Sequence, residues 1–173
     1  MTILLAIAVV CSVQALVLGL VNMRRYRVAD PLPAQPAAAA DLVTVCIPAR
    51  NEEANIEACV RSVLASTGVE VEVLCYDDQS TDATPKIRAK LQAEDRRVRT
   101  AQTVPLPDGW NGKQHGCHRM AEAAHGRWFL FTDADVRFAP DCVARTLATA
   151  GRLDVALLST VPKQTTGTLA EAT

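Results

Sequence analysis

Short apolar runs rich in β-branched and aromatic residues alternate with longer segments that are apolar on one face only, from residue 42 to residue 161. Runs of roughly four to eight such residues, bounded by turn residues, are typical of strands buried on both faces. Apolar side chains three and four positions apart, as at Ile56, Val60 and Val63, are typical of a helix that covers a sheet. The alternation therefore predicts an α/β fold with a mainly parallel sheet flanked by helices.

The same pattern gives bounds for each element. Strands are expected at residues 42–47, 69–76, 97–103, 128–132 and 155–161. Helices are expected at residues 51–66, at residues 81–93 with Thr81 or Asp82 as the cap, at residues 113–124, and from Pro140 onward. Ligands of such folds bind at the carboxyl ends of the strands, so the residues that follow each strand are the candidates for a site.

The size and charge of the chain exclude some classes of partner. Its 173 residues suffice for one ordinary domain, and a content of 49% apolar and 21% charged residues lies in the globular range. The formal net charge is -1 and there is no basic block, so no nucleic-acid partner is expected. The six cysteines occur singly, which favours buried thiols in a reducing compartment over the alternative of a disulfide framework.

The chain begins with an uncharged apolar run. Residues 2–21 contain no proline, and as a helix rising about 1.5 Å per residue they would cross the roughly 30 Å hydrocarbon layer of a membrane. Arg24, Arg25 and Arg27 follow, and such positive residues favour the cytoplasmic side. We therefore expect a single-pass anchor in the cell membrane with the remainder in the cytoplasm. The alternative is a cleaved signal peptide, which would have a positive start and a shorter apolar core.

A spacer follows the apolar run. Residues 28–41 hold three prolines and a run of alanines, and they show no apolar periodicity. The predicted organisation is therefore a transmembrane anchor with a basic flank at residues 1–27, a Pro/Ala-rich linker at 28–41, and one α/β domain at 42–173.

Polar clusters follow the first two predicted strands. The first cluster begins at Pro48 and continues through Arg50, Asn51 and Glu52; it lacks the glycines of a dinucleotide-binding turn, which disfavours NAD or FAD. The second cluster, residues 77–82, begins with two aspartates, Asp77 and Asp78. One of these carboxylates could accept a hydrogen bond from a base N–H or a ribose hydroxyl. The alternative for the second cluster is a capped turn without a ligand.

A third cluster, Asp133-Ala134-Asp135, ends the strand predicted at 128–132. In extended chain, residues i and i+2 point to the same side, so the two carboxylates are expected to project toward one spot. Two anions so placed repel each other unless a cation offsets them. A Mg²⁺ or Mn²⁺ ion shared with a diphosphate would supply that charge, whereas the alternative is a solvated turn.

The loop at residues 107–113 brings glycines, a tryptophan and a lysine together. Lys113 stands at a predicted helix start, where it could meet a phosphate together with free backbone N–H groups. The alternative is a surface turn with a packed Trp110. A zinc site at His115, Cys117 and His118 is disfavoured, because Cys117 would point away from the face that the two histidines share.

Four motifs, IPARNEEANI, YDDQSTDAT, GWNGK followed by HGCHRMAEAAHG, and FTDADV, occur in this order. Together they resemble the donor-binding motifs of family 2 glycosyltransferases with the GT-A fold, over about residues 42–173. The apolar start and the GW-x-GK loop are similar to bacterial inner-membrane enzymes associated with carotenoid or hopanoid glycosylation. The resemblance implies a nucleotide-diphosphate sugar as donor, with a UDP-sugar favoured, and a lipid or membrane-associated acceptor.

The resemblance also implies roles for particular residues. Those around the nucleotide would be Pro48, Arg50, Asn51 and Glu52, with Asp78 or its neighbour Asp77 on the base or ribose. Lys113 would lie near the diphosphate, Asp133 would hold the ribose or the metal, and Asp135 would ligate Mg²⁺ or Mn²⁺.

The implied reaction is attack by an acceptor hydroxyl on the anomeric carbon, with inversion and a carboxylate as general base. The family carries this base downstream of the D-x-D motif, so it is expected beyond Thr173, and the chain resembles a truncated enzyme. Two alternatives are a non-catalytic, membrane-tethered fragment that binds nucleotide sugars, and a sugar nucleotidyltransferase. The latter would need a glycine-rich loop after the first strand, which this sequence lacks.

Overall fold

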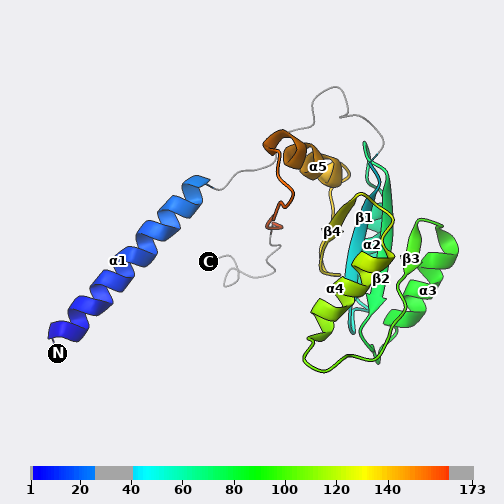
Figure 1. The fold of residues 1–173 in the computed structure, drawn as a ribbon, viewed down its shortest axis with the longest axis horizontal. Helices are drawn as coiled ribbons and strands as arrows, with labels where there is room; N and C mark the ends of the chain where they lie inside the picture. The colour runs from blue at the N-terminus through cyan, green and yellow to red at the C-terminus, as the bar shows by residue number, and fades with distance from the viewer. Residues whose placement is uncertain (1, 26–40, 164–173) are drawn as a thin grey trace. The chain divides into compact units, whose positions relative to one another are not determined.

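The computed structural model describes residues 2–25 and 41–163. Two compact units result: one holds helix α1 (Thr2–Arg25), and the other holds every remaining helix and strand (Figure 1). Arg27, residues 28–40 of the linker predicted at 28–41, and the last ten residues lie outside the described part. We describe each unit by itself.

The second unit is built on a four-stranded sheet. Its strands are β1 (Val43–Ala49), β2 (Val71–Asp77), β3 (Val98–Thr100) and β4 (Trp128–Phe131), in the order β3-β2-β1-β4. All three neighbouring pairs are parallel, and β1 pairs with β2 along its whole length from Val43 to Ala49. The prediction of a mainly parallel sheet is confirmed, and all four carboxyl ends lie at one edge.

Strand β1 continues two residues further than the sequence predicted, through Pro48. The backbone carbonyl of Cys46 accepts from Thr132 on the β4 side, so by alternation Pro48 also faces that side, while Ala49 accepts from Asp78 on the β2 side. Because β4 ends at Phe131, no ladder bond is lost where Pro48 lacks its N–H. A central strand such as β1 can therefore contain a proline at a position beyond the end of its shorter neighbour.

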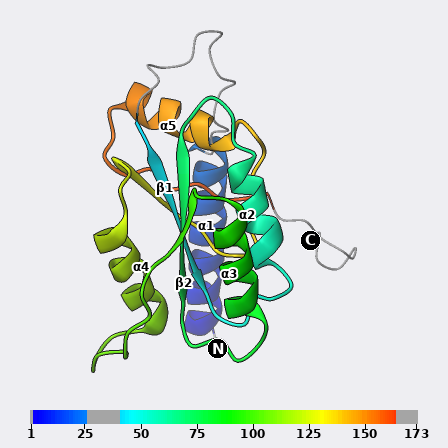
Figure 2. The ribbon, with the colours of Figure 1, turned by 90° about the vertical axis from the view of Figure 1, so that its right-hand side faces the viewer.

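Helices cover both faces of the sheet (Figure 2). On one side lie α2 (Ile56–Leu64) and α3 (Thr84–Glu94), and on the other lies α4 (Gly112–Ala123). Helix α5 (Cys142–Leu153) adds Val143 to the core on the α2 side. The α4 side holds a smaller core of Cys46, Leu74, Tyr76, Ala101 and Met120. This covering of both faces explains why the strands are apolar on both faces.

The buried cysteines are core residues. Cys46, Cys59 and Cys75 are fully buried among apolar side chains. Burial raises the pKa of Cys59 to about 11 and the pKa of Cys75 to about 12, so both thiols are protonated at neutral pH.

Some predicted boundaries differ from the structure. Helix α2 begins at Ile56 instead of residue 51, and α3 begins after Ala83, so neither Thr81 nor Asp82 holds the cap position. The side chain of Asp82 still accepts from the N–H of Thr84, the first residue of α3, at 2.9 Å. The connecting residues also make bonds between the two loops, as described below. Contacts far apart in the sequence thus override the local start signals.

The strand expected at residues 155–161 does not form. Asp154 adopts a left-handed conformation that ends α5, and the N–H of Val155 bonds back to Ala150. Leu157 and Val161 are largely exposed. An apolar run becomes a strand only when a partner strand pairs with it, and no such pairing occurs within the part of the chain that the structure describes.

A polar cluster holds the amino end of the sheet together. The carboxylate of Glu72 on β2 accepts hydrogen bonds from Thr44 at 2.6 Å, from the backbone N–H of His125 at 2.7 Å and from Arg99 at 3.2 Å. Burial opposes ionisation, but these donors outweigh it and hold the pKa of Glu72 below its usual value. The cluster fixes the turn between α4 and β4 against the start of β1.

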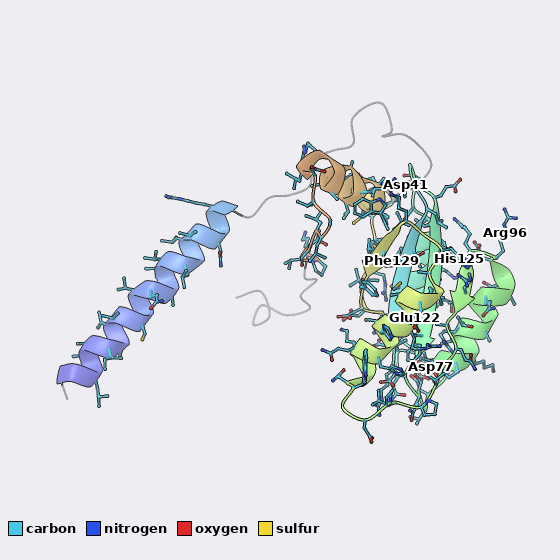
Figure 3. The ribbon with its side chains drawn as sticks, viewed as in Figure 1. Asp41, Asp77, Arg96, Glu122, His125 and Phe129 are labelled. Atoms are coloured by element: carbon cyan, nitrogen blue, oxygen red, sulfur yellow. The ribbon has the colours of Figure 1, made fainter. Side chains whose placement is uncertain are left out.

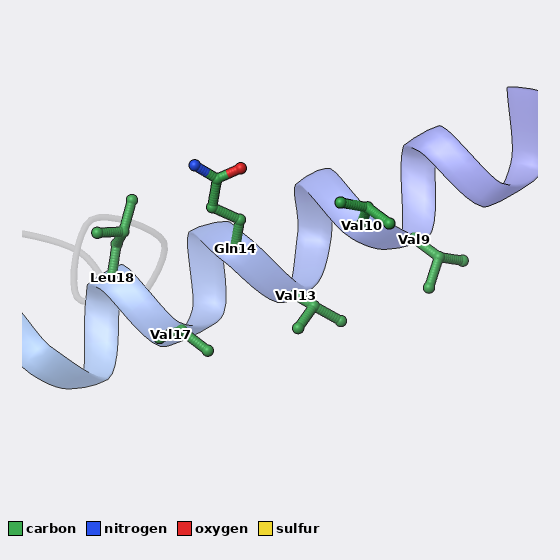
Figure 4. Close-up of a pocket in the computed structure, with 6 residues that line it drawn as sticks. All are labelled: Val9, Val10, Val13, Gln14, Val17 and Leu18. Carbon is green, nitrogen blue, oxygen red and sulfur yellow. The ribbon is translucent and has the colours of Figure 1, made fainter.

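Helix α1 is long and apolar enough to cross a membrane by length and composition, over Leu4–Arg24. The valines and leucines along this helix are exposed. A shallow groove on its surface is lined by residues that include Val10, Gln14 and Val17 (Figure 4). The hydroxyl of Ser12 donates to the carbonyl of Ala8 at 2.9 Å. The hydroxyl is thus satisfied within the helix.

Glycine at position 116 allows α4 to lie close against β2. A Cβ at Gly116 would stand 2.7 Å from a ring carbon of Tyr76, whereas a Cβ at Gly151 in α5 would meet nothing within 4 Å. We expect Gly116→Ala to lower the free energy of unfolding by about 1–2 kcal/mol through overpacking. The control Gly151→Ala should raise it by about 0.5–1 kcal/mol, because alanine favours helix.

Urea denaturation of the full chain in mild detergent, followed by circular dichroism, measures both changes. Equal and stabilising effects at the two positions would show that α4 does not lie as close to Tyr76 as the structure places it.

Candidate functional site

A pocket of about 270 Å³ lies at the carboxyl edge of the sheet. Four separate segments contribute to it: the ends of β1, β2 and β4, and the start of α4. Its lining residues are Pro48, Ala49, Arg50, Glu52, Asp78, Lys113, Asp133, Ala134 and Asp135. The fold therefore brings together most of the residues that the sequence singled out. The first and last of them, Pro48 and Asp135, are 87 positions apart in the sequence.

The pocket is rich in charge of both signs. Its lining includes four carboxylates, those of Glu52, Asp78, Asp133 and Asp135, and two cationic side chains, those of Arg50 and Lys113. Acidic groups thus outnumber basic ones by two. An excess of carboxylates beside two cations suits a ligand that combines phosphate groups with a metal ion.

Each cation lies near one carboxylate. The ammonium of Lys113 is 2.5 Å from Oδ1 of Asp133, and Nη1 of Arg50 is 3.9 Å from Oδ2 of Asp78. The hydrogen bond to Asp133 raises the pKa of Lys113 above its usual value, so this side chain is charged at neutral pH. The side chains of Lys113 and Asp133 are both more than half exposed, so the ion pair is accessible from solvent.

The start of α4 is held against Asp78. The side chain of Asn111 accepts a hydrogen bond from the backbone N–H of Lys113 at 3.0 Å and so caps the helix. A Cβ at Gly112 would stand 2.3 Å from Oδ2 of Asp78. A larger residue there would require the Asp78 carboxylate to move away from the positive end of the helix. The glycines around Trp110 in the sequence were a signal of close approach, although they did not identify Asp78 as the neighbour.

Asp133 and Asp135 do not lie in extended chain, so that part of the prediction is wrong. Strand β4 ends at Phe131, and the chain turns so that the N–H of Val136 bonds to the carbonyl of Asp133 at 3.4 Å. The buried side chain of Ala134 anchors this turn in the core. Both aspartates nevertheless line the pocket, because the turn itself faces it.

Asn51 connects two loops and does not line the pocket. Its backbone takes a left-handed conformation, with φ of 57°. Its N–H donates to the hydroxyl of Ser80 at 2.9 Å, and its side-chain oxygen accepts from the N–H of Thr81 at 2.8 Å. Further bonds between the loops run from Glu52 N to Thr84 Oγ1, from Glu53 N to Asp82 Oδ2 and from Ala83 N to Glu53 Oε2.

Asp77 also lies outside the lining. Its side chain is buried at the carboxyl end of β2, where Figure 3 labels it, and its backbone carbonyl accepts from Thr103 at 3.0 Å. One carboxylate oxygen, Oδ1, has no hydrogen-bond partner among the residues that the structure describes. Of the two neighbouring aspartates, Asp78 is therefore the one that faces the pocket.

The aromatic rings beside the pocket pack on one another. His115 is buried, with its ring 6.3 Å from that of Tyr76 and 5.6 Å from that of Trp110. The ring of His118 lies 5.2 Å from that of Trp110. Both histidines thus have packing roles, and within residues 2–25 and 41–163 no group of three or more His, Cys, Asp or Glu side chains is assembled as a metal site.

The donor set of the pocket fits a hard cation that takes few protein ligands. Carboxylate oxygens suit Mg²⁺ and Mn²⁺, and Mg²⁺ commonly binds through one or two carboxylates together with substrate phosphates. Asp135 is exposed, and no hydrogen bond or ion pair to its carboxylate is found in the described part of the chain. Asp133 and Asp135 are therefore the residues that could hold such an ion.

Comparison with known proteins shows the family of this chain. The model of glycosyl transferase family 2 matches residues 44–171, which include every strand and helix of the second unit except the first residue of β1. The chain belongs to glycosyl transferase family 2. This confirms the resemblance drawn from the four sequence motifs, and the parallel sheet with helices on both faces agrees with the GT-A fold.

Two curated relatives of this family 2 chain are similar in sequence. An uncharacterized protein of Mycobacterium tuberculosis is 37% identical over 109 residues, which are 62% of this chain and 30% of that protein. The 4,4'-diaponeurosporenoate glycosyltransferase of Staphylococcus aureus is 34% identical over 106 residues, which are 61% of this chain and 27% of that enzyme. The match thus spans less than a third of either relative.

Two solved structures are similar to the family 2 domain. Residues 1–349 of S. aureus TarS, solved in complex with UDP, give a TM-score of 0.53 and 25% identity over 64% of this chain and 32% of that TarS fragment. The mannosyltransferase PcManGT of Pyrobaculum calidifontis, in complex with GDP-Man and Mn²⁺, gives a TM-score of 0.53 and 25% identity over 68% of this chain and 36% of PcManGT.

The position of Asn51 in this glycosyltransferase domain predicts a loss of stability on substitution. We expect Asn51→Gly to lower the free energy of unfolding by about 1 kcal/mol, because it removes an acceptor but keeps the left-handed backbone accessible. Asn51→Ala should cost about 1–2 kcal/mol more, since a Cβ disfavours positive φ. Urea denaturation measures both, and an Asn51→Ala protein as stable as the unchanged chain would contradict this role.

Proposed function

We propose that the pocket binds a nucleotide-diphosphate sugar, with a UDP-sugar favoured, together with Mg²⁺ or Mn²⁺. The observation that carries this proposal is the convergence of four distant segments on one charged pocket at the carboxyl edge of a parallel sheet. Open α/β sheets bind nucleotides in this position. TarS with UDP and PcManGT with GDP-Man and Mn²⁺, both similar in fold and sequence, support the class of ligand.

The residues divide by charge. Arg50 and Lys113 are the cations that would face the diphosphate, and the positive end of α4 adds to them. Asp78 would accept a hydrogen bond from the base or the ribose. Pro48 and Glu52 would complete the walls around the nucleotide, whereas Asn51 would act through the loop backbone that it holds. Asp77 lies outside the lining of the pocket.

The metal would be held by Asp133 and Asp135 and by oxygens of the diphosphate. When bound, it supplies Lewis-acid stabilisation of the departing nucleoside diphosphate. The two carboxylates orient it from the turn after β4, and Lys113 and Arg50 share in offsetting the negative charge of the leaving group.

The reaction that we propose is transfer of the sugar to an acceptor hydroxyl with inversion at the anomeric carbon. Such transfer needs a general base beside the acceptor, which by the family resemblance would be a carboxylate downstream of the D-x-D motif. The stretch that matches the two curated relatives covers 30% and 27% of their lengths.

The acceptor that we propose is a lipid or another membrane-associated molecule. Helix α1 suits a membrane span, and we place the pocket on the cytoplasmic side of the inner membrane because of the arginines that follow the apolar run. The S. aureus relative is named for transfer to diaponeurosporenoate, which supports an apolar acceptor.

A second candidate function is binding of the nucleotide sugar without transfer by the chain itself. It is favoured by the lining of the pocket, which contains most of the residues proposed to bind the donor and no group assigned to the acceptor. Turnover of a UDP-sugar by the full chain would distinguish transfer from binding alone.

The metal role of Asp135 predicts a loss of metal-dependent binding. In titration calorimetry of the full chain in mild detergent, we expect Mn²⁺ to raise the affinity for UDP. In the Asp135→Asn protein, we expect the affinity for UDP with Mn²⁺ present to be at least about tenfold lower than in the unchanged chain. Asp108→Asn is the matched control, because Asp108 is also exposed, near α4, and does not line the pocket. Equal UDP and Mn²⁺ binding by the Asp135→Asn protein would rule out this assignment.

A further inference from the structure

The ammonium of Lys113 occupies a position next to the carboxylates proposed to hold the metal. It lies 2.5 Å from Oδ1 of Asp133, and it joins the start of α4 to the turn after β4. Arg50, the other cation of the pocket, lies instead beside Asp78 at 3.9 Å. Lys113 is thus the cation on the Asp133 side of the pocket lining.

The backbone of Lys113 is fixed, but its side chain has room to move. Its N–H is held by the Asn111 cap, and the preceding Gly112 lies against Asp78. Beyond that point extends a flexible four-carbon stem whose side chain is 62% exposed. Ion pairs between exposed side chains contribute little net stability, so exchanging the partner of Lys113 costs little.

Resting on the proposed function, we propose that Lys113 is a built-in counter-ion for the metal site. In the free protein its ammonium neutralises Asp133 in the place of a divalent cation. When a diphosphate enters, it draws the ammonium away from Asp133, and the carboxylate is released to the metal. Lys113 is therefore a positioning residue that makes donor and metal binding depend on each other.

Two consequences follow from this exchange. A metal ion alone competes with the ammonium of Lys113 for Asp133, so its affinity without nucleotide is low. A nucleotide that takes up the ammonium raises the affinity for the metal, and the metal raises the affinity for the nucleotide by the same factor. The charge of Lys113 is stable at neutral pH, since Asp133 and Asp135 both favour its protonated form.

The test is the affinity for Mn²⁺ in the absence of nucleotide, measured on the full chain in detergent by electron paramagnetic resonance of free Mn²⁺. We expect Lys113→Met to bind Mn²⁺ about fivefold more tightly, the effect of one unit charge a few ångströms away in a solvated pocket. Lys113→Arg should change it little. Lys90→Met is the matched control, because Lys90 is similarly exposed but pairs with Glu57 outside the pocket.

An unchanged or weaker Mn²⁺ affinity in Lys113→Met overturns the proposal, as does the absence of Mn²⁺ binding from every variant. In an Asp133→Asn background, the gain from Lys113→Met must also disappear, and its persistence would show that the partner is another carboxylate. Circular dichroism verifies that each variant is folded.

Titration with UDP separates this idea from the proposed function. If no variant binds UDP while Lys113→Met gains Mn²⁺ affinity, the proposed function fails and the counter-ion stands. If UDP and Mn²⁺ bind together while Lys113→Met leaves the affinity for Mn²⁺ alone unchanged, the counter-ion fails and the proposed function stands.

Discussion

Parallel pairing of β1 with the strands on both its sides is the constraint on which the rest of the domain depends. Because β2, β1 and β4 all run in one direction, the residues that follow them emerge at the same edge of the sheet. Polar segments separated by long stretches of sequence thus become neighbours without any local signal. The four carboxylates of the pocket and Arg50 result from this feature of the topology, and the start of α4 adds Lys113.

Close approach then determines which polar groups face one another. Gly116 lets α4 lie against the ring of Tyr76, and Gly112 leaves space for Asp78 beside the start of the helix. The loop bonds of Asn51 hold the segments after β1 and β2 at a fixed separation. The charged side chains therefore extend from a backbone that packing and hydrogen bonds hold in place. By our proposal, only their outer ends, such as the ammonium of Lys113, exchange partners.

The sequence predicted the layers of the fold and most of the pocket, because strand hydrophobicity and helix periodicity are local properties. It did not predict the late start of α2, since residues such as Glu53 bond to the next loop instead of continuing a helix. The unformed strand at 155–161 depended on a partner that periodicity cannot supply. Asn51 and Asp77 were expected around the nucleotide by position in a motif, but neither residue lines the pocket.

The central claim is that the carboxyl edge of the sheet holds a nucleotide diphosphate and a divalent ion together. Anomalous diffraction from crystals of the protein grown with UDP and Mn²⁺ tests it directly. The account predicts one manganese peak within about 2.0–2.2 Å of a carboxylate oxygen of Asp135 and of a phosphate oxygen of UDP, with the diphosphate beside Lys113. UDP bound elsewhere, or a manganese ion without contact to Asp133 or Asp135, would contradict it.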